Sequence, residues 1–156
     1  MSIRGSGFLD RAAAALLGAA LSSGALAQPH AATSPAGRWR TIDDRTGQAK
    51  SIVRIVETNG ELQGTIETIF SPPAPSPNPL CDKCSGELKN KPVVGMRILW
   101  GLKRNGNEYT GGRVIDPEEG KTYRCKLKLV DGGRKLELRG YIGVSALGRT
   151  QTWLRE

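Results

Sequence analysis

The feature that most constrains this chain is a succession of short segments, from Gly37 to Arg155, in which apolar and polar side chains alternate. Alternation with a period of two residues is typical of β-strands that bury one face. Residues 121–130 (KTYRCKLKLV) show this pattern most clearly. Turn sequences such as Asn59-Gly60 and Asp131-Gly132-Gly133 separate the segments, and such turns join neighbouring antiparallel strands. The pattern therefore predicts an antiparallel sheet and no long helix.

We expect about eight strands from this spacing. Their ranges are 37–42, 50–57, 61–70, 96–103, 108–116, 121–130, 134–143 and 149–155. Each strand has one apolar face, and no helix is available to cover it, so the sheet must fold over itself into a barrel or a sandwich. A meander closes most simply as an up-and-down barrel. The predicted fold class is therefore all-β, with a single antiparallel β-barrel over residues 37–156.

A barrel of this size is either filled by side chains or wide enough for one small ligand. Four large side chains fall on predicted inner faces and are the candidate ligand-binding residues: Phe70, Met96, Trp100 and Tyr123. Residues 71–92 form a long connection with six prolines. Long connections in compact domains are often functional or mobile, and this one is placed to cover one end of the barrel.

Residues 1–27 have the composition of a secretory signal peptide. Arg4 and Arg11 make the start basic, and residues 12–26 form an apolar run that is shorter than the roughly 20 residues needed to span a bilayer. Small residues at Ala25 and Ala27 suit a signal peptidase. We therefore expect cleavage after Ala27, a flexible leader over residues 28–36, and a periplasmic or secreted protein that does not span a membrane. An uncut N-terminal anchor is the alternative.

Cys81 and Cys84 form a Cys-x-x-Cys motif within the proline-rich connection. In an exported chain such a pair predicts a local disulfide. A redox pair is expected at a helix N-terminus after a strand, and a structural zinc site needs four ligands, whereas the chain has three cysteines and one histidine, His30. Redox and metal roles remain as alternatives. Cys125 lies on the apolar face of its strand and is expected to be a buried free thiol.

Asp43, Asp44 and Asp116 are the carboxylates that acid–base chemistry would use, but each stands in a turn-forming sequence. Aspartates in turns accept local backbone hydrogen bonds, so we interpret them as structural. No histidine within the domain is available to activate a serine, and no glycine-rich phosphate loop joins a strand to a helix. We therefore expect a protein that is not an enzyme and that uses neither a cofactor nor a metal ion.

The whole chain has a net charge of +8. Basic side chains line the polar faces of two consecutive predicted strands: Arg124, Lys126, Lys128, Lys135 and Arg139. Such faces are usually just solvated, but a basic patch also attracts anions. Outside the cytoplasm nucleic acid is not an expected partner, whereas anionic lipid headgroups and acidic wall polymers are present.

Several motifs along the domain resemble those of one bacterial family. They are Gly37-Arg38-Trp39, Asp43-Asp44, Thr46-Gly47, Cys81-Asp82-Lys83-Cys84, 91–96 (KPVVGM), Gly111-Gly112, Asp116-Pro117, 120–123 (GKTY), 139–143 (RGYIG) and 148–153 (GRTQTW). Together they resemble the exported domain-of-unknown-function family 2147 over essentially the whole domain. The resemblance implies a lipocalin-like β-barrel and leaves the function open, because the family is uncharacterised.

Gly37 and Trp39 are also similar to the opening of lipocalin-type barrels, in which an indole closes one end beneath an arginine from near the last strand. Arg149 opens the last predicted strand here. A guanidinium stacked on an indole gains roughly 0.5–2 kcal/mol. This resemblance implies that Trp39 contacts Arg149, or another residue of the last strand, and closes the barrel.

These inferences predict an exported, non-enzymatic binding protein that holds a small molecule, with an apolar one favoured, in the barrel or at its mouth. The alternative is an envelope interaction module whose basic outer face contacts anionic lipid headgroups or wall polymers. An apolar cavity would favour the first hypothesis, and a filled interior would favour the second.

Overall fold

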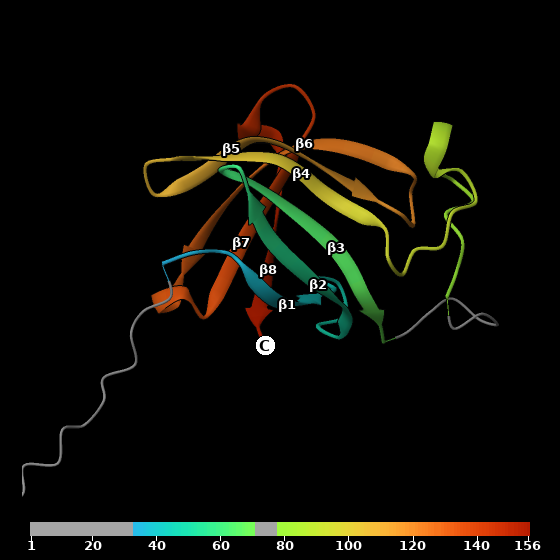
Figure 1. The fold of residues 1–156 in the computed structure, drawn as a ribbon, viewed down its shortest axis with the longest axis horizontal. Coiled ribbons are helices and arrows are strands. Elements are labelled where there is room, and N and C mark those ends of the chain that lie inside the picture. Colours follow the sequence, from blue (N-terminus) through green and yellow to red (C-terminus); the bar gives the residue numbers. More distant parts are fainter. Residues whose placement is uncertain (1–32, 71–77) are drawn as a thin grey trace, which may run out of the picture.

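The computed structural model describes residues 33–70 and 78–156. Within these ranges, antiparallel strands follow one another around a closed barrel, which β1 completes by pairing with β8 (Figure 1). The strands are β1 (Gly37–Ile42), β2 (Ala49–Thr58), β3 (Glu61–Ile69), β4 (Arg97–Asn105), β5 (Glu108–Asp116), β6 (Lys121–Val130), β7 (Lys135–Tyr141) and β8 (Arg149–Arg155). Short 3-10 helices lie in three connections: η1 (Gly86–Leu88), η2 (Asp131–Gly133) and η3 (Ser145–Leu147). The predicted up-and-down barrel is confirmed.

The predicted signal peptide and residues 28–32 of the predicted leader lie outside the described residues. The last residues of that leader, in contrast, are held against the barrel. Pro35 is buried, and its carbonyl accepts a hydrogen bond from the Trp39 indole at 2.7 Å. No helix in the described ranges is long and apolar enough to cross a membrane.

Tight turns account for the antiparallel order. Between β2 and β3, Asn59 and Gly60 have φ angles of 53° and 74°. Two successive positive φ angles are the signature of the type I′ turn, whose twist matches that of the strands it joins. Thr58 and Glu61 consequently pair directly across the hairpin.

The barrel interior is packed at one end and hollow at the other. The packed half lies beside the β2–β3, β4–β5 and β6–β7 turns, and we call it the closed end. Its large apolar side chains are each at most 5% exposed: Val53, Ile55, Leu62, Leu99, Leu102, Tyr109, Leu127 and Leu136. Burial of each such side chain contributes about 1.5–3 kcal/mol. The opposite end, with the β1–β2, β3–β4, β5–β6 and β7–β8 connections, is the open end.

Trp39 seals the closed end together with Arg155. The antiparallel pairing of β1 with β8 sets the two residues opposite each other, and the guanidinium carbon lies 4.2 Å from the centre of the indole ring. That guanidinium also donates to three backbone carbonyls, those of Ser34 (2.8 Å), Ala36 (3.0 Å) and Gly133 (2.7 Å). The predicted contact between Trp39 and the last strand is therefore confirmed. The choice of Arg149 was wrong, because Arg149 begins β8 and so lies at the open end.

A β-bulge near the end of β3 changes which side chains face inward. The pairing with β2 shifts at Glu67, which is an extra residue in the ladder. An extra residue reverses the alternation beyond it. Ile69 therefore faces the interior, whereas Phe70 is 46% exposed and has the Arg40 guanidinium 5.8 Å from its ring. The predicted interior position of Phe70 is wrong for this reason.

β4 is irregular in the same way at two places. Its pairing with β3 has one extra residue at Ile98 and another between Leu99 and Leu102. Ile98 and Leu99 are both buried, and Trp100 lies outward, paired with the exposed Arg113. The predicted run of alternate inward side chains along this strand is thus broken.

Candidate functional site

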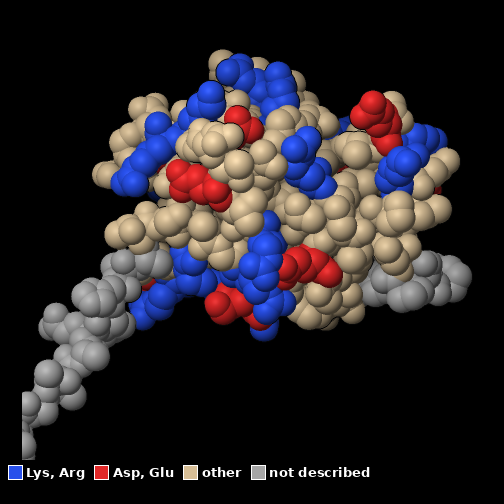
Figure 2. All heavy atoms as spheres, in the orientation of Figure 1, with Lys and Arg blue, Asp and Glu red and all other residues tan. Residues whose placement is uncertain are grey.

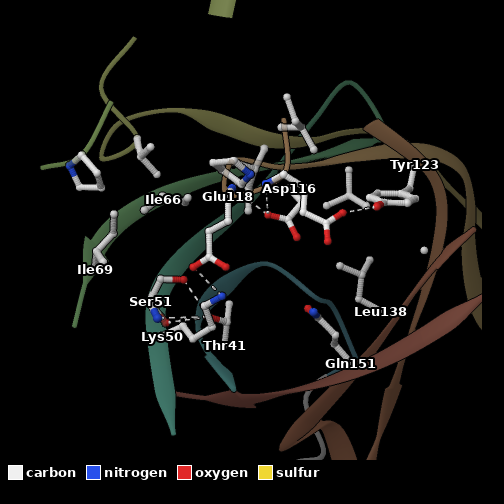
Figure 3. A pocket seen from close by; sticks show the side chains of 18 of the residues that line it. Thr41, Lys50, Ser51, Ile66, Ile69, Asp116, Glu118, Tyr123, Leu138 and Gln151 are labelled. Carbon is white, nitrogen blue, oxygen red and sulfur yellow. Dashed lines mark hydrogen bonds and ion pairs between the residues drawn. The ribbon is translucent and has the colours of Figure 1, made fainter. Parts of the chain in front are cut away.

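A cavity of about 680 Å³ occupies the open half of the barrel (Figure 3). Its inner wall is apolar and draws on most of the strands: Ile66, Ile69, Ile98, Val114, Leu138 and Trp153. Trp153 and Leu138 are 2% and 4% exposed and come from the middle of β8 and β7. Because the closed half is filled, the cavity is a cup open at one end and not a channel.

One side of the cup carries neutral polar groups from β1, β2 and β8. The hydroxyls of Thr41 and Ser51 lie 2.7 Å apart, and the backbone N–H of Ser51 donates to the Thr41 hydroxyl at 3.1 Å. The Gln151 side-chain oxygen accepts from the Trp153 indole at 3.4 Å. Each of these groups is held by a hydrogen bond to a neighbouring residue, and they offer hydrogen bonds to a molecule that lies along this wall.

Charged side chains form the rim of the cup. The Lys50 ammonium lies 2.8 Å from the Glu118 carboxylate, which points toward it across the mouth in Figure 3. Arg149 makes a two-pronged ion pair with Asp44, with Nε 2.6 Å from Oδ2. The Arg149 guanidinium lowers the pKa of Asp44, and the hydrogen bond to that carboxylate raises the pKa of Arg149. The rim therefore joins β2 to the β5–β6 turn and β8 to the β1–β2 connection.

The β5–β6 turn contributes further carboxylates. The Tyr123 hydroxyl donates to Glu119 Oε2 at 2.7 Å. This hydrogen bond raises the pKa of Tyr123 to about 12 and lowers the pKa of Glu119. Asp116 Oδ1 accepts the backbone N–H groups of Glu118 (2.9 Å) and Glu119 (3.3 Å). Tyr123 thus presents its ring to the cup and its hydroxyl to the rim.

The turn interpretation of two aspartates is confirmed. Asp116 caps the β5–β6 turn as described, and Asp43 Oδ1 accepts the N–H groups of Arg45 (2.8 Å) and Thr46 (3.1 Å), which lowers the pKa of Asp43. Asp44 instead holds Arg149. Asp43 and Asp116 therefore stabilise their own turns, and Asp44 holds a residue far away in the sequence. In residues 33–70 and 78–156, no group of three His, Cys, Asp or Glu side chains is arranged to hold a metal ion.

The predicted disulfide is confirmed, and it borders the cup. Cys81 and Cys84 are bonded, with Cα atoms 5.3 Å apart, and both are buried. Their loop rests on Gly120 of the β5–β6 turn, where an added Cβ would lie 2.0 Å from the Lys83 carbonyl oxygen. The loop contributes Pro79, Leu80, Asp82, Lys83 and Val93 to the cavity wall. The described part of the long connection therefore covers one side of the mouth.

Of the four predicted interior residues, only Tyr123 lines the cup. Phe70 lies outside, as described above. Met96 is buried just before β4, and Trp100 is half-buried; both border a second hollow of about 510 Å³ between β4 and the long connection. Cys125 is a buried free thiol, as predicted, and burial raises its pKa to about 12.

Sequence reasoning missed the rim: Lys50 and Glu118 are not among the predicted site residues, and Arg149 is predicted at the opposite end of the barrel. The three residues are far apart along the chain. Their common signal is position: each lies within two residues of a strand end that faces the open end.

Ion pairs neutralise part of the basic outer face. Lys126 pairs with Glu108 at 3.3 Å, Lys128 with Glu137 at 3.2 Å, and Lys135 with Asp131 at 3.4 Å. Figure 2 shows acidic and basic side chains interspersed over much of the visible face. The lysines expected to form a continuous basic patch are therefore individually compensated.

The family model described as an uncharacterized protein conserved in bacteria (DUF2147) matches residues 37–155. The chain belongs to this family. Of the motifs that carry the resemblance, the segments around Asp44, Cys81–Cys84, Asp116, Tyr123 and Arg149 meet at the open end. Several of the motifs that carry the resemblance therefore lie around the mouth of the cup.

Among solved structures, the chain is similar to protein HP1028 from Helicobacter pylori, whose title places it in the lipocalin family. The TM-score is 0.67 and the sequence identity is 23%, over 79% of this chain and 83% of that one. At this identity the likeness concerns the fold, which is lipocalin-like. Comparison with curated proteins gives no match.

Proposed function

We propose that this DUF2147 protein is an exported, non-enzymatic binding protein that holds one small amphipathic molecule in the open half of its barrel. The observation that carries the proposal is the cup of about 680 Å³ with an apolar interior and a charged rim. Ligand sites in proteins are commonly hollows of about 300–1,000 Å³ with mostly apolar walls and a few placed polar groups. An apolar body would lie against Ile66, Leu138 and Trp153, and a polar end would meet the rim.

Two observations support a binding role over catalysis. The rim carboxylates are engaged by cations, backbone N–H groups or the Tyr123 hydroxyl, and this engagement supports structural and recognition roles for them. The lipocalin-like fold also suits storage of a small ligand, since the walls come from a rigid closed sheet. Export is supported by the apolar N-terminal segment and by the disulfide, because such bonds persist in oxidising compartments.

The test is native mass spectrometry of the protein purified from its own cell envelope. The wild type is compared with a variant in which a larger side chain fills the cup. Gly140 lines the cavity, and an added Cβ there would make only an ordinary contact, 3.6 Å from Tyr123 Cβ. Gly140→Ile should therefore fold while its larger side chain occupies ligand space. Thr152→Ile is the matched control, because Thr152 is exposed on neighbouring β8.

The wild-type protein and Thr152→Ile should carry a non-covalent adduct of small-molecule mass and bind a fluorescent naphthylamine probe, and Gly140→Ile should do neither. Equal binding of the probe by all three proteins, or no adduct and no probe binding in the wild type, would reject the proposal.

A further inference from the structure

The connection between β7 and β8 holds three aliphatic side chains in water at the edge of the open end. Ile142, Val144 and Leu147 are 71%, 60% and 84% exposed, and residues 142–148 include no charged side chain. In Figure 1 this connection projects at the top of the view. None of the three residues lines the cup, so binding of a ligand in the barrel does not account for their exposure.

The projecting shape of this connection is held by specific contacts. The Arg139 guanidinium donates to the carbonyls of Ser145 (2.7 Å) and Ala146 (3.0 Å) and to the hydroxyl of Thr150 (2.8 Å). Gly148 lies so close to β7 that an added Cβ would be 2.5 Å from the Gly140 carbonyl oxygen. The aliphatic side chains are thus held in water by a turn of fixed shape. Their hydration is unfavourable, and burial against a partner would remove this penalty.

Arginines on β5 and β6 lie in register with Tyr141, beside the base of this turn. Arg113 and Arg124 face each other across β5 and β6, and the Arg124 guanidinium lies 5.6 Å from the ring of Tyr141, which ends β7. Among described residues, Arg113, Arg124 and Arg139 have no carboxylate in ion-pair range, unlike the paired lysines nearer the closed end. Like charges opposite each other are unfavourable, so this pair favours an anionic partner. Lys and Arg atoms mark the same upper edge in Figure 2.

We propose that residues 142–148, with Arg113, Arg124, Arg139 and Tyr141 around them, dock on a lipid bilayer that contains anionic phospholipids. An uncharged, projecting tip enters the acyl boundary, a tyrosine suits the headgroup level, and arginines attract anionic headgroups. A second copy of the chain fits poorly, because a symmetric contact through this tip would bring the two sets of arginines together. Docking here sets the open end beside the membrane. This docking goes beyond the proposed ligand binding and does not depend on it.

Vesicle co-sedimentation tests the proposal with protein purified without detergent from cells that express the full chain. Binding to vesicles of phosphatidylcholine with phosphatidylglycerol should exceed binding to phosphatidylcholine alone and should fall as salt rises. Leu147→Ser should weaken binding by about ten- to a hundredfold, since burial of one leucine side chain corresponds to a factor in that range. Val56→Ser is the matched control, because Val56 is 42% exposed on β2, away from this turn.

The arginines are tested by Arg124→Gln, which should weaken binding to the anionic vesicles about fivefold. Lys128→Gln is its control, because Lys128 is already paired with Glu137, and it should change binding little. Circular dichroism should show that all four variants remain folded, as expected for exposed positions.

The proposal is overturned if Leu147→Ser binds as well as the wild type, if Val56→Ser loses as much affinity, or if neutral vesicles bind equally well. It is also overturned if the wild type does not bind vesicles and instead self-associates through the turn. In that case Leu147→Ser would abolish the self-association. The two proposals separate cleanly: Gly140→Ile should lose the small ligand and keep vesicle binding, and Leu147→Ser should do the reverse.

Discussion

The two arginines of β8 offer a sharp test of how the barrel is closed. Arg155→Ala removes the guanidinium from the Trp39 ring, which costs about 0.5–2 kcal/mol. It also removes the donor to the Gly133 carbonyl, which lies at a buried residue, and a hydrogen bond from a charged donor contributes about 1.5–3 kcal/mol. The Ser34 and Ala36 carbonyls are nearer the surface, where water replaces the lost donor. The expected loss in free energy of unfolding is about 2–5 kcal/mol.

Arg149→Ala provides the matched comparison within the same strand. Its ion pair with Asp44 is largely exposed, with 60% and 37% of the two side chains accessible, and exposed ion pairs contribute about 0–1 kcal/mol. Both variants should be unfolded in guanidinium chloride, with tryptophan fluorescence and circular dichroism recorded together. For a domain whose total stability is about 5–15 kcal/mol, the two effects are easily distinguished. A cost for Arg149→Ala equal to or above that for Arg155→Ala would refute the account of the closed end.

Three further predictions concern single positions. Gly120→Ala should destabilise the fold and expose the disulfide loop to proteolysis, because the added Cβ would collide with the Lys83 carbonyl. Gly106→Ala is the control: its φ is 63° and the space around it is open, so it should lower the free energy of unfolding only through backbone strain. Cys125 should react with iodoacetamide at about pH 9 only when the protein is denatured, because folding raises the pKa of this thiol from 9.0 to about 12. The stability that the buried neutral thiol contributes is therefore complete below about pH 9 and is lost as the pH rises toward 12. Unfolding measured as a function of pH can test this loss. N-terminal sequencing of the exported protein should begin at Gln28, and recovery of Met1 in a membrane fraction would contradict export with cleavage.

For some side chains, the direction in which they face cannot be predicted from one strand alone. Within one strand, alternation predicts that Phe70 follows Ile66 to the interior. A bulge at Glu67 reverses that alternation, and a bulge is a property of two paired strands. The same reasoning applies to Trp100, whose outward position follows from the register between β3 and β4. The choice between Arg149 and Arg155 likewise required the direction in which β8 meets β1.

The barrel architecture can be predicted from the sequence, because alternation and turn chemistry are local properties. Residues 121–130 alternate between polar and apolar side chains and form a strand with those bounds, and the disulfide between Cys81 and Cys84 joins residues only three positions apart. Which half of the barrel is filled and which is hollow cannot be predicted in this way. That division depends on the summed volume of side chains from many strands at each level. Rim pairs such as Arg149 with Asp44, 105 positions apart in the chain, form only when closure of the barrel brings strand ends together. The exposure of the turn at residues 142–148 likewise depends on closure, which leaves this connection uncovered.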